Sequence, residues 1–458
     1  MTVEPLTPRP EEGELRRVLG PLDAGCIVVG AVIGVGIFFA PSVVARQAGS
    51  GNLALLAWAI GGVIALLGAL TFAELGGLYT RSGAQYEVLR DAYGPLPAFL
   101  FVFCNSTAVQ AGATAIIATV CAEHLGTAAT GNQPGTVAAR GIAALLIAGL
   151  MAANIVGVRW GSRVQNATVF AKIATLVLVT LLAAFAAPAV PAAVATQPES
   201  NGPAGIRLVG AVLAGLVSVL FTYGGWQHAL WIAGEIREPR RNIPRAIVGG
   251  MLVVTVVYLL VNWAYLRLLG YHGVAGTKIL AADAAAVVWP HAGRRIIAAA
   301  VALSAFGVLN AQLLSGPRLV YGMARDGRFF APFARASARF ATPYAAILLI
   351  GCMALILLVT AGKDAVDRLI TGVVAVDSVF FVLTGLAVVV LRRKRPHADR
   401  PVRVPAYPAV PLLFVLGEIG VIVGAFCNVD WEAALAGAGW IVAAGVCYFL
   451  FFRGPERR

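Results

Sequence analysis

The stretch VVGAVIGVGIFFAP (residues 28–41) lies in the first long apolar segment of the chain. It places Gly30, Gly34 and Gly36 within seven positions and ends at Pro41. Glycine costs about 1 kcal/mol relative to alanine in a helix interior, and unwound backbone at membrane depth is tolerated only where it is buried in protein or lines a polar cavity. The stretch therefore predicts a helix that unwinds beside a cavity.

The composition predicts an all-α integral membrane protein. Of 458 residues, 59% are hydrophobic and 12% charged, and the mean hydropathy is +0.83. Apolar runs of about 20 residues are typical of membrane-spanning helices. Twelve transmembrane helices are expected, at 21–46, 52–79, 95–123, 137–156, 165–188, 207–234, 244–270, 296–323, 343–361, 366–391, 409–427 and 432–452.

The distribution of positive charge predicts the orientation. Most of the 35 Lys and Arg residues fall in loops that share one side of the membrane if both termini lie inside, whereas the outer loops contain Lys278, Arg294, Arg295 and Lys363. This bias places both termini in the cytoplasm of a multi-pass cell-membrane protein. Residues 1–20 and 453–458 are then cytoplasmic tails, the first without the pattern of a cleaved signal. The expected partner is the lipid bilayer, and no nucleic acid is expected.

A second glycine-interrupted segment indicates internal symmetry. VLFTYGGWQ (219–227) lies in the sixth apolar segment, five segments after the first interruption. Paired interruptions at corresponding positions of two halves are typical of transporters built from inverted repeats. Residues 21–188 would form one repeat of five helices, 207–391 the second, and 409–452 two further helices.

Two such breaks suit a ligand with two opposite charges. Free N–H groups at a helix N-terminus attract a carboxylate, and free C=O groups attract an ammonium. An α-amino acid carries both groups on one carbon, so the pattern predicts an amino acid carrier. The alternative is close helix packing through small residues, which the 51 glycines also allow.

The same segments resemble a known family. VVGAVIGVGIF is similar to the first helix of the amino acid–polyamine–organocation superfamily. Three further segments resemble its L-type amino acid transporter branch, namely FTYGGWQ with GEIREPRRNIPRAI (221–247), LSAFGVLNAQLLSGPRLVYGMARDG (303–327) and LRRKRPHADRPVRVPAYPAVP (391–411). The resemblance implies a LeuT-like fold with helices 1 and 6 unwound at mid-membrane.

The resemblance also implies backbone roles. Substrate carboxylate would be bound by the amides of Gly34, Val35 and Gly36, and substrate ammonium by the carbonyls of Val32, Phe221, Thr222 and Gly224. Phe221 would close over the substrate, with Trp226 and Gln227 near the side-chain pocket. Many members have proline where Gln110 falls, which leaves the side-chain preference open. The loop EHLGTAATGNQPGT has no cysteine, so no disulfide-linked heavy chain is expected.

Lys172 is a charge well inside the fifth apolar segment. Such residues are costly in a membrane and mark functional sites, unless the side chain reaches the interface. The resemblance implies that its ammonium replaces a sodium ion by reaching the carbonyls of Gly30 and Ile33 and the hydroxyl of Ser304. The protein would then be a sodium-independent exchanger or facilitator, or a proton-coupled symporter if Lys172 deprotonates.

Other charges in apolar segments leave alternatives open. Asp377 either faces the substrate pocket or packs between helices, and Glu74 is expected to pair with Arg81 or Arg90. Glu418 has no evident role. A neutral, small-to-medium amino acid is the preferred substrate, and a cationic amino acid or polyamine is favoured if Asp377 faces the pocket. The charged segment EIREPRRNIPRA is a solvated loop or a cytoplasmic gate.

Other functional classes fit less well. An enzyme would need a nucleophile with its base or an HExxH cluster, and neither pattern occurs. A channel would need a continuous polar pore, and a primary pump would need a Walker motif. No metal and no cofactor are expected.

Overall fold

The computed structural model describes residues 15–185, 205–277, 280–289, 293–360, 365–428 and 431–452. Within these ranges the chain is helical, and its β pairing is a single bridge between Leu19 and Ile236. Six of the described helices are long and apolar enough to cross a membrane, and five shorter ones are also apolar. The protein is thus an all-helical membrane protein with several long apolar spans.

The helices follow the predicted segments, with boundaries moved by several residues. The helices that matter for the site are α1 (Pro21–Val32), α2 (Ala40–Ala48), α8 (Val158–Phe185), α10 (Ile206–Tyr223), α11 (His228–Trp231), α12 (Pro239–Gly276), α14 (Gly293–Ser315), α17 (Ala365–Lys394) and α18 (Ala409–Asn428). Around them lie α3 (Gly51–Leu78), α4 (Ala84–Tyr93), α5 (Pro95–Cys104), α6 (Gln110–Thr130), α7 (Thr136–Val156), α13 (Leu280–Val288), α15 (Pro317–Arg325), α16 (Tyr344–Thr360) and α19 (Trp431–Phe451).

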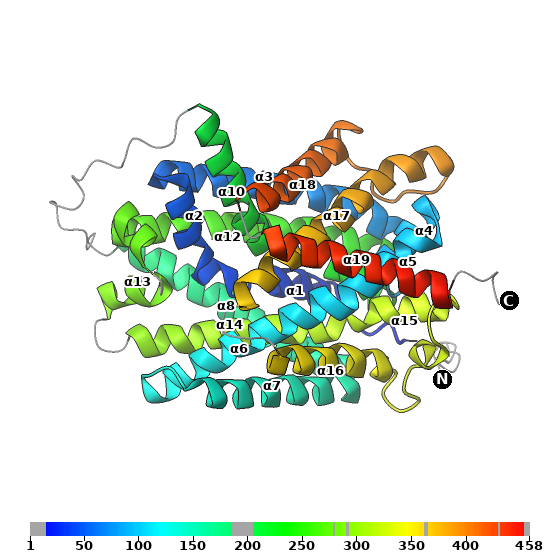
Figure 1. The fold of residues 1–458 in the computed structure, drawn as a ribbon, viewed down its shortest axis with the longest axis horizontal. Helices are drawn as coiled ribbons and strands as arrows, with labels where there is room; N and C mark the ends of the chain where they lie inside the picture. The colour runs from blue at the N-terminus through cyan, green and yellow to red at the C-terminus, as the bar shows by residue number, and fades with distance from the viewer. Residues whose placement is uncertain are drawn as a thin grey trace, which may run out of the picture.

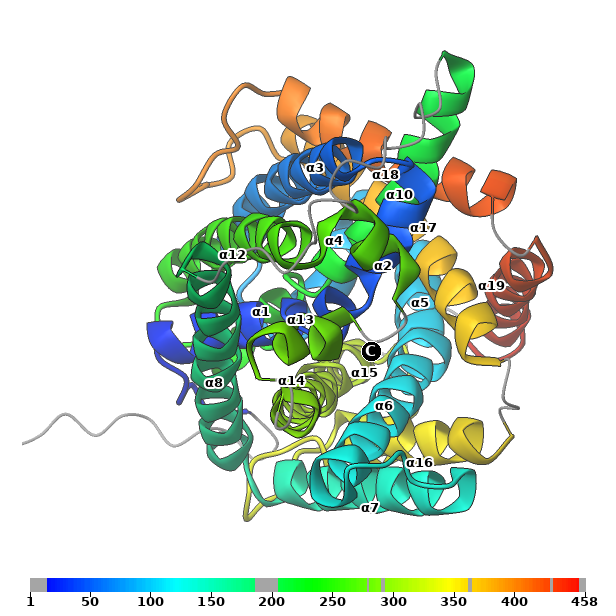
Figure 2. The same cartoon turned by 90° about the vertical axis from the view of Figure 1, so that its left-hand side faces the viewer.

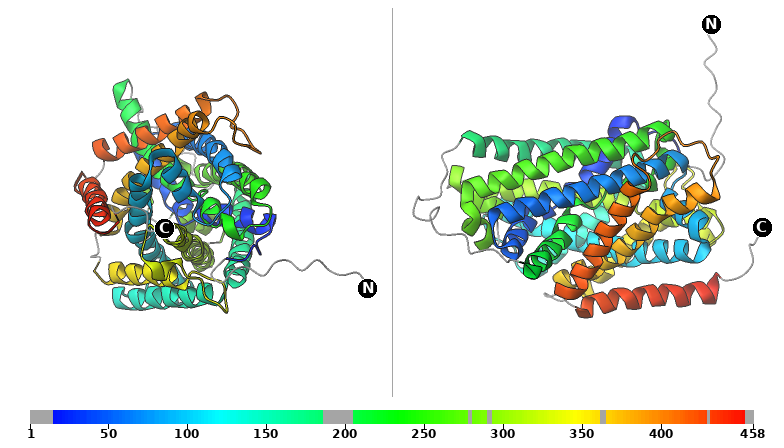
Figure 3. Two further views of the ribbon diagram at one scale, coloured as in Figure 1. Left: turned by 90° about the vertical axis from the view of Figure 1, so that its right-hand side faces the viewer. Right: turned by 90° about the horizontal axis from the view of Figure 1, so that it is seen from above.

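The long helices run side by side along the long axis of the molecule (Figures 1 and 3). α1 lies inside the bundle and contacts α8, α12 and α14 (Figure 2). α7 and α16 pack together on one edge of the bundle. The first broken helix is therefore enclosed by other helices, where unwound backbone is sheltered from lipid.

The third predicted span differs from a plain helix. It runs from Pro95 to Thr130, longer than the predicted 95–123, and a π-helical turn at Asn105–Val109 separates α5 from α6. π-helical turns within longer helices often occur at functional sites. The turn ends beside Gln110, the first residue of α6.

The expected pairing of Glu74 with Arg81 or Arg90 is wrong. Its carboxylate accepts hydrogen bonds from Arg392 (2.9 and 2.5 Å) and from the amide of Val404 (2.8 Å), and it pairs with Arg400. Arg81 instead lies 3.9 Å from Glu87, and Arg90 pairs with Asp91 and Asp326. The end of α17 and the loop after it pack against α3, so Arg392, Arg400 and Val404 lie nearer to Glu74 than Arg81 and Arg90 do.

Candidate substrate site

The first break separates α1 from α2. α1 ends at Val32, a 3-10 turn occupies Gly36–Phe38, and α2 begins at Ala40. Within the described chain, the amides of Val35 and Gly36 donate to no other group, and the amide of Gly34 faces the Tyr258 hydroxyl. Two adjacent backbone donors are therefore available to an anion, as at a helix N-terminus.

The second break follows α10. The chain is extended at Gly224, and Gly225 has φ +126°, a conformation that other residues rarely adopt. A Cβ on Gly225 would lie 2.8 Å from the carbonyl carbon of Ala31, so the two breaks touch backbone to backbone. The Gln227 side chain accepts a hydrogen bond from the Gly225 amide at 3.1 Å, which holds the second break in shape.

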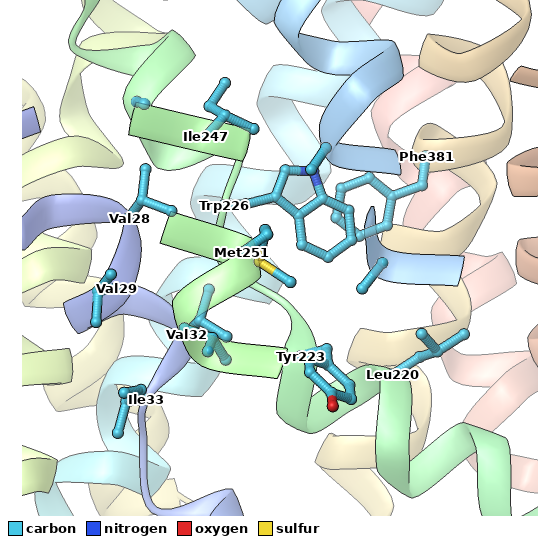
Figure 4. Close-up of a cluster of buried hydrophobic side chains, with 14 of the residues drawn as sticks. Val28, Val29, Val32, Ile33, Leu220, Tyr223, Trp226, Ile247, Met251 and Phe381 are labelled. Atoms are coloured by element: carbon cyan, nitrogen blue, oxygen red, sulfur yellow. The ribbon is translucent and has the colours of Figure 1, made fainter. Parts of the chain in front are cut away.

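Apolar side chains fix the two breaks against their neighbours (Figure 4). Val32, the last residue of α1, and Ile33, which follows it, both lie in this cluster. Trp226 stacks on Phe381 of α17 with ring centroids 5.2 Å apart and an interplanar angle of 14°. The second break is thereby anchored to α17.

A cavity of about 350 Å³ opens between the two breaks. All nine residues predicted to bind substrate line it, namely Val32, Gly34, Val35, Gly36, Phe221, Thr222, Gly224, Gln227 and Asp377. The tertiary structure therefore gathers into one place residues that lie in the first, sixth and tenth apolar segments. Phe221 is half-buried at the cavity wall, as a side chain that covers a ligand must be.

Some predicted acceptors already have a donor. The Tyr258 hydroxyl contacts the carbonyls of Val32 (2.8 Å) and Thr222 (3.3 Å), and the Phe221 carbonyl accepts from the Gly224 amide (3.2 Å). A carbonyl oxygen has two lone pairs and can accept a second hydrogen bond. Tyr258 is a residue that the sequence analysis missed; its only signal is a buried hydroxyl in an apolar segment.

Further polar residues of the cavity were also missed. Gln110, His228, Gln312, Ser378 and Glu418 all line it. Only Gln110 and Glu418 carried a signal, the first by its departure from the family pattern and the second as a carboxylate in an apolar segment.

Lys172 lies outside the cavity, behind the first break. Its ammonium donates to the carbonyls of Gly30 (3.0 Å) and Ile33 (2.8 Å), and the side chain is 2% exposed. It therefore does not reach toward the membrane interface. The Ser304 hydroxyl, expected to contact Lys172, lies instead 3.5 Å from the same Ile33 carbonyl and 3.4 Å from that of Gly34.

Two glycines leave space for α8 side chains behind the first break. A Cβ on Gly307 would lie 2.9 Å from the Lys172 ammonium, and a Cβ on Gly30 would lie 1.9 Å from the side chain of Gln165. The lysine therefore fits because Gly307 lacks a side chain, and Gly30 leaves room for Gln165 on the same helix as the lysine. Within the described residues, no cluster of His, Cys, Asp and Glu could hold a metal ion.

The chain matches the model of the family described as amino acid permease over residues 19–452. It is 31% identical to the b(0,+)-type amino acid transporter 1 of Mus musculus over 448 residues, which cover 95% of this chain and 88% of the mouse protein. It is 28% identical to the serine/threonine exchanger SteT of Bacillus subtilis, with 90% and 92% of the two chains covered. For the large neutral amino acids transporter small subunit 2 of Rattus norvegicus, the identity is 30%, with 87% and 75% covered. The chain belongs to the amino acid permease family, in the L-type branch of the amino acid–polyamine–organocation superfamily, and is a multi-pass membrane transporter of amino acids rather than an enzyme.

Proposed function

We propose that the protein is a sodium-independent carrier that exchanges or equilibrates α-amino acids across the cell membrane. The observation that carries the proposal is the placement of two unpaired amides, at Val35 and Gly36, beside the backbone of the second break in one cavity. Amides and carbonyls at that spacing recognise the groups that all α-amino acids share. Phe221 closes the cavity over the bound substrate.

Sodium independence rests on Lys172. Its ammonium supplies a fixed positive charge to the carbonyls of Gly30 and Ile33, which are the kind of oxygen ligands that a sodium ion takes at a helix break. A resident cation on these carbonyls leaves no room for a second. Proton-coupled symport is the second candidate, because a buried lysine can lose its proton during a cycle.

The fold that we propose is LeuT-like, with twelve spans. Two inverted repeats of five helices, at 21–188 and 207–391, are followed by two more helices at 409–452. The interruptions after Val32 and Tyr223 support this arrangement, since they fall in the first helix of each repeat. Both termini would lie in the cytoplasm, and no heavy chain would be linked by a disulfide.

In that orientation the structure corresponds to an outward-facing state. The cavity extends from the breaks along α6 to Val120, toward the end of α6 assigned to the outside. On the opposite side, Arg318 and Glu235 form a buried ion pair (2.6 Å), and Leu19 pairs with the backbone at Glu235 (2.9 Å). Alternating access would require these contacts to separate when the cytoplasmic side opens.

The test is uptake of a radiolabelled amino acid mixture into proteoliposomes without sodium, with and without unlabelled amino acids trapped inside. An exchanger takes up label only when the lumen contains substrate, and a facilitator equilibrates label in both cases. An imposed pH gradient, with the membrane potential clamped, separates these from a proton symporter, which accumulates label. A requirement for sodium would contradict the proposal.

A further inference from the structure

Two carboxylates lie on the same wall of the substrate cavity. Asp377 on α17 and Glu418 on α18 both line it, and the two helices pack against each other. Ser378, next to Asp377 on α17, also lines the cavity, and Glu418 is 2% exposed. No lysine or arginine occurs among the described residues that line the cavity.

The same cavity contains amide oxygens without a partner. Gln110 is 3% exposed, and its Oε1 has no hydrogen-bond partner within the described chain. The Oε1 of Gln312 is also unpartnered, and both side chains line the cavity. Buried acceptors without a donor are costly and are normally satisfied by a ligand or by water.

These carboxylates and amide oxygens all favour the same kind of ligand, one that donates hydrogen bonds. Carboxylates and amide oxygens accept hydrogen bonds, and the carboxylates attract a positive charge. A substrate with an aliphatic side chain would leave two acidic groups in a membrane cavity with no cation beside them. A substrate with a positively charged, donor-rich end would satisfy both the charge and the acceptors.

We propose that Asp377 and Glu418 form a side-chain subsite for the ammonium or guanidinium group of a basic amino acid. The α-carboxylate and α-ammonium of that substrate occupy the two breaks, so the inference rests on the proposed function and specifies the substrate class of the same site. The sequence analysis preferred a neutral substrate and favoured a cationic one if Asp377 faces the pocket. Because Asp377 lines the cavity, we favour the cationic substrate.

The path between the breaks and the acidic wall suits a methylene chain. Leu220 and Phe221, just before the second break, and Phe381, one turn from Asp377, line the cavity with apolar surface. Lysine and arginine side chains bury their methylene stems on such surface and extend the charged end to a polar partner. Because Phe381 stacks on Trp226, the acidic wall on α17 is held at a fixed distance from the second break.

The experiment compares substrates that have a side-chain charge with analogues of similar shape that lack it. Binding to the purified protein in lipid nanodiscs is measured by competition against a radiolabelled amino acid. Arginine is paired with citrulline, and lysine with norleucine. We expect the charged member of each pair to bind about tenfold more tightly or better, since loss of one partner of a buried charge pair has an effect of at least this size.

Variants then assign the preference to the two carboxylates. Asp377→Asn and Glu418→Gln keep the side-chain shape and remove the charge, and each should abolish the preference for arginine over citrulline while citrulline binding persists. Glu123→Gln is the matched control, because Glu123 lies on α6 and does not line the cavity; it should keep the wild-type preference. Retained citrulline binding shows that a variant is folded.

The outcomes are distinct. Equal binding of arginine and citrulline to the wild-type protein overturns the subsite, as does a preference that both variants retain. If the two variants change only the pH dependence of neutral amino acid binding, then Asp377 and Glu418 carry a proton. That result also overturns the subsite. Failure of the wild-type protein to bind any amino acid would instead contradict the proposed function itself.

Discussion

The Lys172 ammonium donates to the Ile33 carbonyl at 2.8 Å, which joins the middle of α8 to the residue that follows α1. A second bond at 3.0 Å reaches Gly30, one turn earlier. Carbonyls at a helix C-terminus carry partial negative charge, and a cation there is stabilising. One side chain thus stabilises the unwound backbone that forms a wall of the substrate cavity.

Lys172→Ala is expected to slow transport at least tenfold, because it removes the charged donor from the Gly30 and Ile33 carbonyls at a cost of about 1–3 kcal/mol. Counterflow rates in proteoliposomes, normalised to inserted protein, measure the effect. Gly307→Ala should act similarly, since its Cβ would lie 2.9 Å from the ammonium. Gly249→Ala, where no atom lies within 4 Å, is the control. Wild-type rates in Lys172→Ala would mean that the lysine is dispensable.

Gly36→Leu is expected to abolish substrate binding. The new Cβ would lie 2.9 Å from the side chain of Thr222, and the rest of the side chain would cover the amides proposed to bind the carboxylate. The readout is the rise in melting temperature on adding amino acid to the purified protein. Gly25→Leu provides the comparison, because nothing lies within 4 Å of that position. A normal shift in Gly36→Leu would rule out the backbone site.

Phe221→Ala should reduce transport far more than stability. Phe221 is half-buried at the cavity wall, so its truncation removes little packing, whereas the fully buried Phe72 should cost about 3–5 kcal/mol when replaced by alanine. Uptake and thermal unfolding are measured on both variants. If Phe221→Ala retains both the rate and the affinity of the wild-type protein, Phe221 serves only in packing.

Glu235→Gln is expected to destabilise the described state by about 3–5 kcal/mol, since it leaves Arg318 buried without its partner. The matched control is Asp399→Asn. Asp399 pairs with Arg240, but both side chains are more than half exposed, so the loss should stay below about 1 kcal/mol. Thermal unfolding of the two variants is the measurement. Equal stability losses would show that the Arg318–Glu235 pair has no special role in closing this side.

The positions of the two breaks could be predicted from the sequence because their cause is local. Gly34, Gly36, Gly224 and Gly225 permit dihedral angles that interrupt a helix wherever the rest of the chain lies. The charge of Lys172 in an apolar segment is equally visible, and the family resemblance supplied the carbonyls of Gly30 and Ile33 as its partners.

The sequence by itself therefore determined the membrane class, the apolar segments and the two interruptions, since each follows from the composition or backbone freedom of a short stretch. Only the tertiary structure decided which side chains meet. Tyr258 reaches Val32, and Glu74 pairs with Arg392 rather than Arg81. Asp377 and Glu418 share a cavity wall for the same reason. These contacts depend on how each helix is rotated and set against its neighbours, which is fixed by packing among residues far apart in the chain.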